Sequence, residues 1–304
     1  MSGCAASMTT SARDRTQWAV MALLLAGLLW GLTWLPMKYF AAQGLSGPMF
    51  TLLSYGSTGL MALPWIVWRR HLWWSQRLAV TAIALTGGAA NVCFVTALIN
   101  GEVVRVMLLF YLAPIWGVLG GRVFLAEPLT KLRVGGVACA VLGAMLLLGG
   151  PAVFDSPPGW VDLLALASGM LYATQNIVTR AANDLSLDIK ALVVFVGCGV
   201  LSAAVVLLSS ASMPAISFIM AGQLVAFGSV WMLTAMLFTA WGVTHLEAGR
   251  AAILLVFELL AATISAMWIG GERLNSLEWF GAILIVTAAL LEALPTRTDQ
   301  GQKT

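Results

Sequence analysis

Charged residues are scarce in this sequence. Only 10% of its 304 residues are Asp, Glu, Lys or Arg, whereas 60% are hydrophobic. A soluble domain averages roughly 25% charged residues, so this chain cannot cover a large water-facing surface. The scarcity argues against an ordinary soluble enzyme. Because the basic residues form no stripe outside the loops, nucleic-acid binding is not expected either.

Patterns that would indicate catalysis or metal binding are also absent. The sequence has no GxxxxGK[ST] loop to hold nucleotide phosphates and no HExxH pair. Its two histidines stand far apart, and its four cysteines form no CxxC pair. We therefore expect no cofactor, no metal site and no enzymatic activity. An intramembrane enzyme stays open as the alternative from outside transport.

Long apolar runs are what the sequence contains instead. A helix needs about 20 apolar residues to cross a bilayer, and ten such runs follow one another with short polar breaks. They lie at 18–37, 47–68, 78–98, 103–125, 131–150, 160–181, 189–210, 223–243, 248–270 and 277–294. The pattern predicts an all-α integral membrane protein with ten transmembrane helices.

Basic residues are distributed unevenly among the loops between these runs. Ten spans place both termini on one side of the membrane, and 13 of the 16 basic residues then fall on that side. Only Lys38, Arg105 and Arg273 fall on the other side. Because cytoplasmic loops carry an excess of Lys and Arg, we predict a multi-pass protein of a bacterial-type inner membrane with both termini in the cytoplasm.

The two halves of the sequence repeat each other. At one constant offset, Glu102 matches Glu247, Arg105 matches Arg250, and Glu127 matches Glu272. Each half holds five predicted spans, and an odd number inverts the second half in the membrane. Inverted repeats are typical of secondary transporters, whose substrate site lies between the repeats near the bilayer midplane. The predicted division is a tail at 1–17, a first five-helix repeat at 18–150, a linker at 151–159, an inverted five-helix repeat at 160–294 and a tail at 295–304.

Two stretches resemble a known family. The segment FYLAPIWGVLGGRVFLAEPLTKLRVGGVACAVLGAMLLL is similar to the end-of-helix-4 motif of the EamA branch of the drug/metabolite transporter superfamily. LWGLTWLPMKYF is similar to the first-helix pattern of that branch. The resemblance covers about residues 18 to 294, and the chain as a whole looks most like the YddG-type exporters of amino acids. The resemblance implies a carrier that exports amino acids, with aromatic and other apolar ones favoured.

A secondary transporter that works by alternating access is therefore the predicted function. Its partners would be a small-molecule substrate, an amino acid, and the surrounding membrane lipid, with protons as a candidate coupling ion. Ten helices in two repeats suffice to enclose a pathway within a monomer. A broad-specificity drug or metabolite exporter and a nucleotide-sugar-like carrier remain alternatives.

Glu258 stands near the middle of the run at 248–270. It is the one acidic residue near mid-depth in the predicted spans, where an ionised side chain costs roughly 2.5–3.5 kcal/mol. Two interpretations stay open: the carboxyl group holds its helix to a neighbour, or it lines the pathway and binds a substrate ammonium group or exchanges a proton. Ala113 and Pro114 occupy the matching place in the first half, so the family pattern assigns Glu258 no role.

Aromatic and amide side chains supply the other candidate pathway residues. Trp30 and Trp34 are spaced to share a helix face, as are Tyr172 and Asn176. Such side chains can line a cavity for a solute with an apolar body and a polar head, although ordinary helix packing would also explain them. The complete predicted set is Trp30, Trp34, Asn91, Phe94, Tyr111, Tyr172, Asn176 and Glu258.

Smaller features predict helix geometry. Gly27 and Gly31 form a small-xxx-small pair, which favours close packing of helices. Pro114 predicts a bend beside Tyr111. Glu127 and Glu272 are predicted to cap the helix that follows each of them.

Overall fold

The computed structural model describes residues 2–124, 131–147, 158–182, 184–209, 214–245 and 248–293, and these residues form helices and connections without strands. Six helical segments within them are long and apolar enough to cross a membrane. These are Gln17–Ala42, Gly47–Trp68, Arg70–Asn100, Trp160–Thr179, Leu187–Leu208 and Phe218–Thr239. Shorter apolar helices lie at Val103–Gly117, Val134–Leu146, Phe257–Trp268 and Ser276–Ala288.

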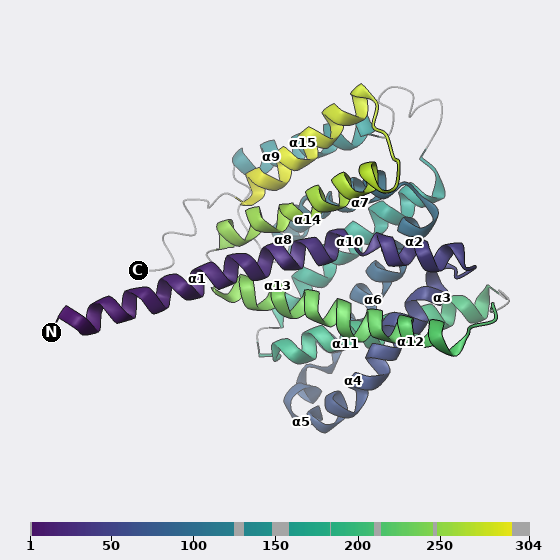
Figure 1. Cartoon of the computed structure of the whole chain (residues 1–304), viewed down its shortest axis with the longest axis horizontal. Coiled ribbons are helices and arrows are strands. Elements are labelled where there is room, and N and C mark those ends of the chain that lie inside the picture. The colour runs from purple at the N-terminus through teal and green to yellow at the C-terminus, as the bar shows by residue number, and fades with distance from the viewer. Residues whose placement is uncertain are drawn as a thin grey trace.

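The first half contains helices α1 to α9 (Figure 1). Their bounds are α1 Ser2–Gly31, α2 Trp34–Ala42, α3 Gly47–Thr51, α4 Ser57–Trp68, α5 Arg70–Trp73, α6 Arg77–Asn100, α7 Val103–Phe110, α8 Ala113–Phe124 and α9 Lys131–Leu147. A π-helical turn at Leu52–Gly56 joins α3 to α4, and a 3-10 turn at Trp74–Gln76 joins α5 to α6.

The second half contains helices α10 to α15. Their bounds are α10 Trp160–Ala181, α11 Leu187–Leu208, α12 Phe218–Ala226, α13 Leu233–His245, α14 Ala248–Trp268 and α15 Ser276–Ala293, with a π-helical segment at Phe227–Met232 between α12 and α13. Most of these helices and those of the first half lie where the apolar runs predict helices. The exceptions are α1, which begins at Ser2 within the predicted tail 1–17, and α5, which lies between the predicted runs 47–68 and 78–98.

Proline interrupts two of the predicted spans. Helical hydrogen bonding breaks between α1 and α2 at Leu32 and Thr33, and between α7 and α8 at Tyr111 and Leu112. In each case a proline stands in the first turn of the following helix: Pro36 in α2 and Pro114 in α8. Proline has no N–H to donate to the carbonyl group four residues earlier, and it is tolerated at the start of a helix.

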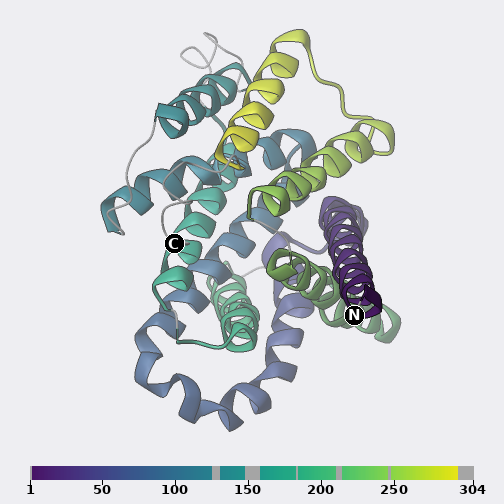
Figure 2. The same ribbon diagram turned by 90° about the vertical axis from the view of Figure 1, so that its left-hand side faces the viewer.

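The two halves pack by an exchange of helices, in the sense that the first helix of each half lies against helices of the other half. In the second half, α10 contacts α6, α7 and α8 of the first half, and α1 in turn contacts α13 and α14 of the second half. The last helices of the halves, α9 and α15, lie side by side along one edge of the bundle (Figures 1 and 2). Helices α1, α6, α7, α8, α10, α13 and α14 therefore take part in the packing of the two halves against each other.

Polar contacts join the halves at the end of the bundle that holds Lys38 and Glu272. The Arg105 guanidinium donates to both carboxylate oxygens of Asp162, at 2.7 and 3.0 Å. Glu272 accepts hydrogen bonds from the backbone N–H groups of Val103 and Val104 at 2.6 and 2.8 Å. A carboxylate at a helix N-terminus satisfies N–H groups that the helix leaves free.

Glu272 does cap a helix, but the prediction that it caps the helix that follows it is wrong. Its carboxylate caps α7 of the first half, and the helix that follows it, α15, is capped locally by Asn275 and Glu278. The cause is the exchange of helices, which brings the loop after α14 against the start of α7. Glu127, the repeat mate of Glu272, lies outside the described residues.

We expect Glu272→Gln to lower the thermal unfolding temperature of the purified protein. The amide oxygen can accept one of the two backbone hydrogen bonds but carries no charge, and a hydrogen bond to a charged group contributes roughly 1.5–3 kcal/mol. Thermal unfolding in detergent would measure the change. Glu102→Gln is the matched control, because Glu102 is exposed and its side chain makes no capping bond to α7. Equal unfolding temperatures for the two variants would contradict the prediction.

Candidate functional site

An aromatic cluster surrounds the break between α7 and α8. Phe110, the last residue of α7, is its centre: ring centroids lie 4.7 Å away in Phe94 of α6, 5.4 Å away in Tyr172 of α10 and 5.9 Å away in Tyr111. The rings are tilted or edge-on to one another, which is the favourable geometry for aromatic pairs. Residues from the two halves therefore meet at the point where the helix is interrupted.

Glu258 of α14 adds a carboxyl group to this cluster. The Tyr111 hydroxyl donates a hydrogen bond to it, and Tyr172 is near enough to interact electrostatically with it. Asn176, one turn after Tyr172 on α10, is near enough to interact with the Tyr172 side chain. The mid-span carboxyl group thus has polar partners within the bundle, as an ionisable group at membrane depth requires.

The backbone of α14 around Glu258 is held by α1. A Cβ atom added to Gly27 would lie 3.2 Å from the Glu258 nitrogen, and one added to Gly31 would lie 2.7 Å from the Glu258 carbonyl oxygen. These distances show that α1 and α14 approach closely only because both positions are glycine. The backbone of Glu258 therefore faces α1, while its carboxyl group reaches Tyr111.

A second close approach shapes the break itself. A Cβ added to Gly169 of α10 would lie 2.8 Å from the Phe110 carbonyl oxygen. That carbonyl is the one to which residue 114 would donate if it were not proline. Gly169 thus lets α10 pack directly against the interrupted turn, which brings Tyr172, one turn further along α10, to the Phe110 ring.

The structure brings five of the eight predicted residues together and places the other three elsewhere. Phe94, Tyr111, Tyr172, Asn176 and Glu258 form the cluster with Phe110. Asn91 lies one turn before Phe94 and donates to the Gly87 carbonyl of its own helix at 2.9 Å.

Trp30 and Trp34 make contacts between helices. The indole N–H of Trp30 donates to the Thr239 hydroxyl of α13 at 3.2 Å, whereas that of Trp34 donates to the Ser265 hydroxyl of α14 at 2.9 Å. The break after Gly31 separates the two indoles, so they reach different helices. Trp34 is buried, with 6% of its surface exposed. Its geometry is that of a packing residue.

Phe110 is the cluster residue that the sequence does not single out. A phenylalanine within an apolar run does not by itself indicate a binding site. Its position four residues before Pro114 was the available clue, since that spacing places it at the helix end created by the proline.

An open groove lies apart from the aromatic cluster. It has a volume of about 600 Å³ and an almost entirely apolar lining from α1, α2, α12, α13 and the π-helical segment between the last two. Trp231 lies in its wall and donates to the Leu29 carbonyl at 3.0 Å. None of the eight predicted residues lines this groove, so it does not define the site.

A helical bundle with membrane-spanning segments, a broken helix and a polar group at the break defines a membrane transporter as the class of protein. The chain belongs to the EamA-like transporter family, which it matches over residues 17–149 and 159–293.

Proteins similar to the chain include a curated transporter and a protein of known structure. One is a riboflavin transporter of Rhizobium johnstonii, 27% identical over 175 residues, which are 55% of this chain and 54% of that protein. The chain therefore matches only about half the length of this relative. The other is a protein of known crystal structure, which superposes with a TM-score of 0.59 at 18% identity over 94% of this chain and 99% of its own. The second likeness shows the fold alone.

Proposed function

We propose that this transporter exports amino acids, aromatic ones above all, through a site formed by Phe94, Phe110, Tyr111, Tyr172 and Glu258. The observation that carries the proposal is the joining of four aromatic rings to one mid-membrane carboxyl group at a broken helix. The rings offer an aromatic or apolar side chain a matching surface. The carboxyl group offers a substrate ammonium group its counter-charge.

Helix breaks support the same assignment. Discontinuous helices in transporters expose backbone carbonyl groups and helix ends where substrates bind. Here the break between α7 and α8 lies beside Tyr111, and α10 from the other half packs against it. A relative movement of the two halves would change the distance between Tyr111 and Glu258, which is what alternating access would require of the proposed site.

The proposed membrane arrangement keeps ten spans in two inverted five-helix repeats, with both termini cytoplasmic in a bacterial inner membrane. The six long and four shorter apolar helices support the number, and the exchange of α1 and α10 between the halves supports the repeat. The site draws on both halves of one chain, so a monomer is a sufficient unit. Glu258 is the proposed proton-exchanging group if transport is coupled to protons.

A flat heteroaromatic solute of the riboflavin type is the second candidate substrate, because a relative of the matched region is a riboflavin transporter. The aromatic cluster suits a fused ring as well as a benzyl or indole group. The two candidates differ in their need for Glu258, since riboflavin has no ammonium group for the carboxylate to bind.

Flux into or out of proteoliposomes that contain the purified chain would test the proposal. The panel should include phenylalanine, tryptophan, leucine, riboflavin and a lipophilic cation, each with and without an imposed pH gradient, against protein-free vesicles. We expect phenylalanine and tryptophan to move several-fold faster than leucine. Movement of riboflavin alone would replace the amino-acid assignment, and movement of the lipophilic cation alone would favour a drug exporter.

A further inference from the structure

Tryptophan and arginine side chains gather where the chain turns from α4 to α6. We define this corner as residues 68–78, which include α5 and the 3-10 turn after it. Three of its large apolar side chains are strongly exposed: Trp68 by 69%, Trp74 by 59% and Leu78 by 81%. Arg70 and Arg77 are also exposed. In Figure 1 the corner lies at the lower edge of the bundle, below α11.

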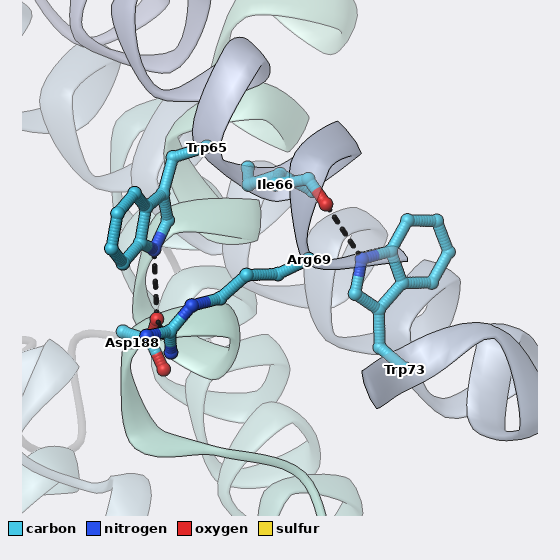
Figure 3. Close-up of polar contacts among 5 residues, drawn as sticks. All are labelled: Trp65, Ile66, Arg69, Trp73 and Asp188. Carbon is cyan, nitrogen blue, oxygen red and sulfur yellow. Dashed lines mark hydrogen bonds and ion pairs between the residues drawn. The ribbon is translucent and has the colours of Figure 1, made fainter. Parts of the chain in front are cut away.

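Contacts with α11 fix the shape of this corner (Figure 3). Asp188 accepts from the Arg69 guanidinium at 2.9 Å and from the Trp65 indole N–H at 2.8 Å, through the same carboxylate oxygen. The Arg69 guanidinium also lies 4.4 Å from the centre of the Trp65 ring. Trp73 is held by a 2.9 Å hydrogen bond from its indole to the Ile66 carbonyl. Arg69 is therefore occupied by a structural contact.

Within the part of the chain that the structure describes, Arg70 and Arg77 form no ion pair with an acidic residue. Among the described residues the ion pairs are Arg69–Asp188 and Arg105–Asp162. Asp184, another carboxylate that contacts this corner, accepts from Gln76 at 3.1 Å. The Arg77 guanidinium lies 5.9 Å from the centre of the Trp74 ring, which orients it without neutralising it.

We propose that this corner binds the phosphate headgroup of an anionic phospholipid through Arg70 and Arg77. Guanidinium groups bind phosphate oxygens with paired N–H donors. Tryptophan rings settle at the headgroup level of a membrane. Trp68 lies two residues before Arg70, the Trp74 ring lies beside Arg77, and Asp188 of α11 anchors the corner through Arg69. The exposed Trp68 and Leu78 side chains match acyl chains, which a free phosphate ion does not have.

Native mass spectrometry of the purified full-length protein would measure this binding. The probes are phosphatidylglycerol and phosphatidylcholine with identical acyl chains. We expect wild-type protein to retain phosphatidylglycerol in preference to phosphatidylcholine. The double variant Arg70→Gln/Arg77→Gln should bind phosphatidylglycerol roughly 30-fold more weakly, because each surface arginine adds roughly fivefold to the affinity for an anionic lipid.

Arg122→Gln/Arg273→Gln is the matched control, since it also removes two exposed arginines. An equal loss in this control would overturn the proposal, because it would show an effect of net charge alone. Wild-type protein that binds both lipids equally would overturn it as well.

Two further variants keep the result interpretable. Arg70→Lys/Arg77→Lys retains both charges but lacks the paired N–H donors, so it should still prefer phosphatidylglycerol over phosphatidylcholine with an affinity between those of the wild type and the glutamine variant. A misfolded corner would show no preference. Trp68→Ala should weaken phosphatidylglycerol binding but not the binding of soluble glycerol phosphate. Displacement of phosphatidylglycerol by millimolar glycerol phosphate would mean that the corner recognises free phosphate, and the lipid assignment would be wrong.

Discussion

Replacement of Glu258 by glutamine is expected to reduce amino-acid transport in proteoliposomes by about ten- to a hundredfold. Glutamine preserves the size of the side chain and can still pair with the Tyr111 hydroxyl, so the aromatic cluster should keep its shape. It cannot supply the charge that an ammonium group needs, and a hydrogen bond to a charged partner is worth roughly 1.5–3 kcal/mol, or about one to two powers of ten in affinity. An amide also exchanges no proton, so any dependence of wild-type flux on a pH gradient should disappear.

Two comparisons make the Glu258 result specific. Asp184→Asn removes a carboxylate from an exposed position and should leave flux unchanged. Riboflavin flux, if it occurs, should fall much less than phenylalanine flux in Glu258→Gln, because no ammonium group is involved. Wild-type phenylalanine flux with unchanged pH dependence in Glu258→Gln would refute the site. The carboxyl group would then serve only to join α14 to Tyr111.

The positions of the long apolar helices follow from where the apolar runs lie in the sequence. A span such as Leu187–Leu208 has to be helical, because a bilayer provides no water to satisfy an open backbone. The break between α7 and α8 was also predictable, because proline at position 114 has no backbone N–H to donate within a helix. What composition does not show is which helices touch, because lipid-facing and buried apolar residues look alike in a sequence.

The partners of individual polar side chains were harder to predict for the same reason. Trp30 and Trp34 have the right spacing to share a face, but the break after Gly31 turns them toward Thr239 and Ser265. Glu272 looked like a cap for the helix after it, whereas the exchange of helices places it on α7. Local spacing predicts contacts within one continuous helix, whereas the contacts of Trp30, Trp34 and Glu272 cross from one half to the other.

Glu258 was predictable as a residue of interest because a carboxyl group at membrane depth is costly. Its surroundings were only partly predictable. Tyr111 and Tyr172 were candidates through their residue type, but Phe110 became central only once Gly169 allowed α10 to reach the broken turn. A close approach between backbones depends on both surfaces, and a single sequence shows only that glycines are present.

Gly31→Ala is expected to destabilise the protein by about 1–3 kcal/mol, the usual cost of forcing atoms into a packed interface. The new methyl group would lie 2.7 Å from the Glu258 carbonyl oxygen, 2.8 Å from the Ala261 Cβ and 2.9 Å from the Ala262 nitrogen. Two of these atoms belong to backbone that cannot rotate away, so α1 and α14 must separate. Because α14 carries Glu258, the separation should also weaken its contact with Tyr111 and lower flux, although no group of the site has changed chemically.

Gly222→Ala provides the matched control for Gly31→Ala. Gly222 lies within α12, and a Cβ added there meets nothing within 4 Å. Alanine is preferred over glycine inside a helix by roughly 0.5–1 kcal/mol, so this variant should unfold at an equal or slightly higher temperature with unchanged flux. The same chemical change therefore has opposite expected signs at the two positions. If both variants shifted the unfolding temperature in the same direction, the close contact between α1 and α14 would not be what positions Glu258.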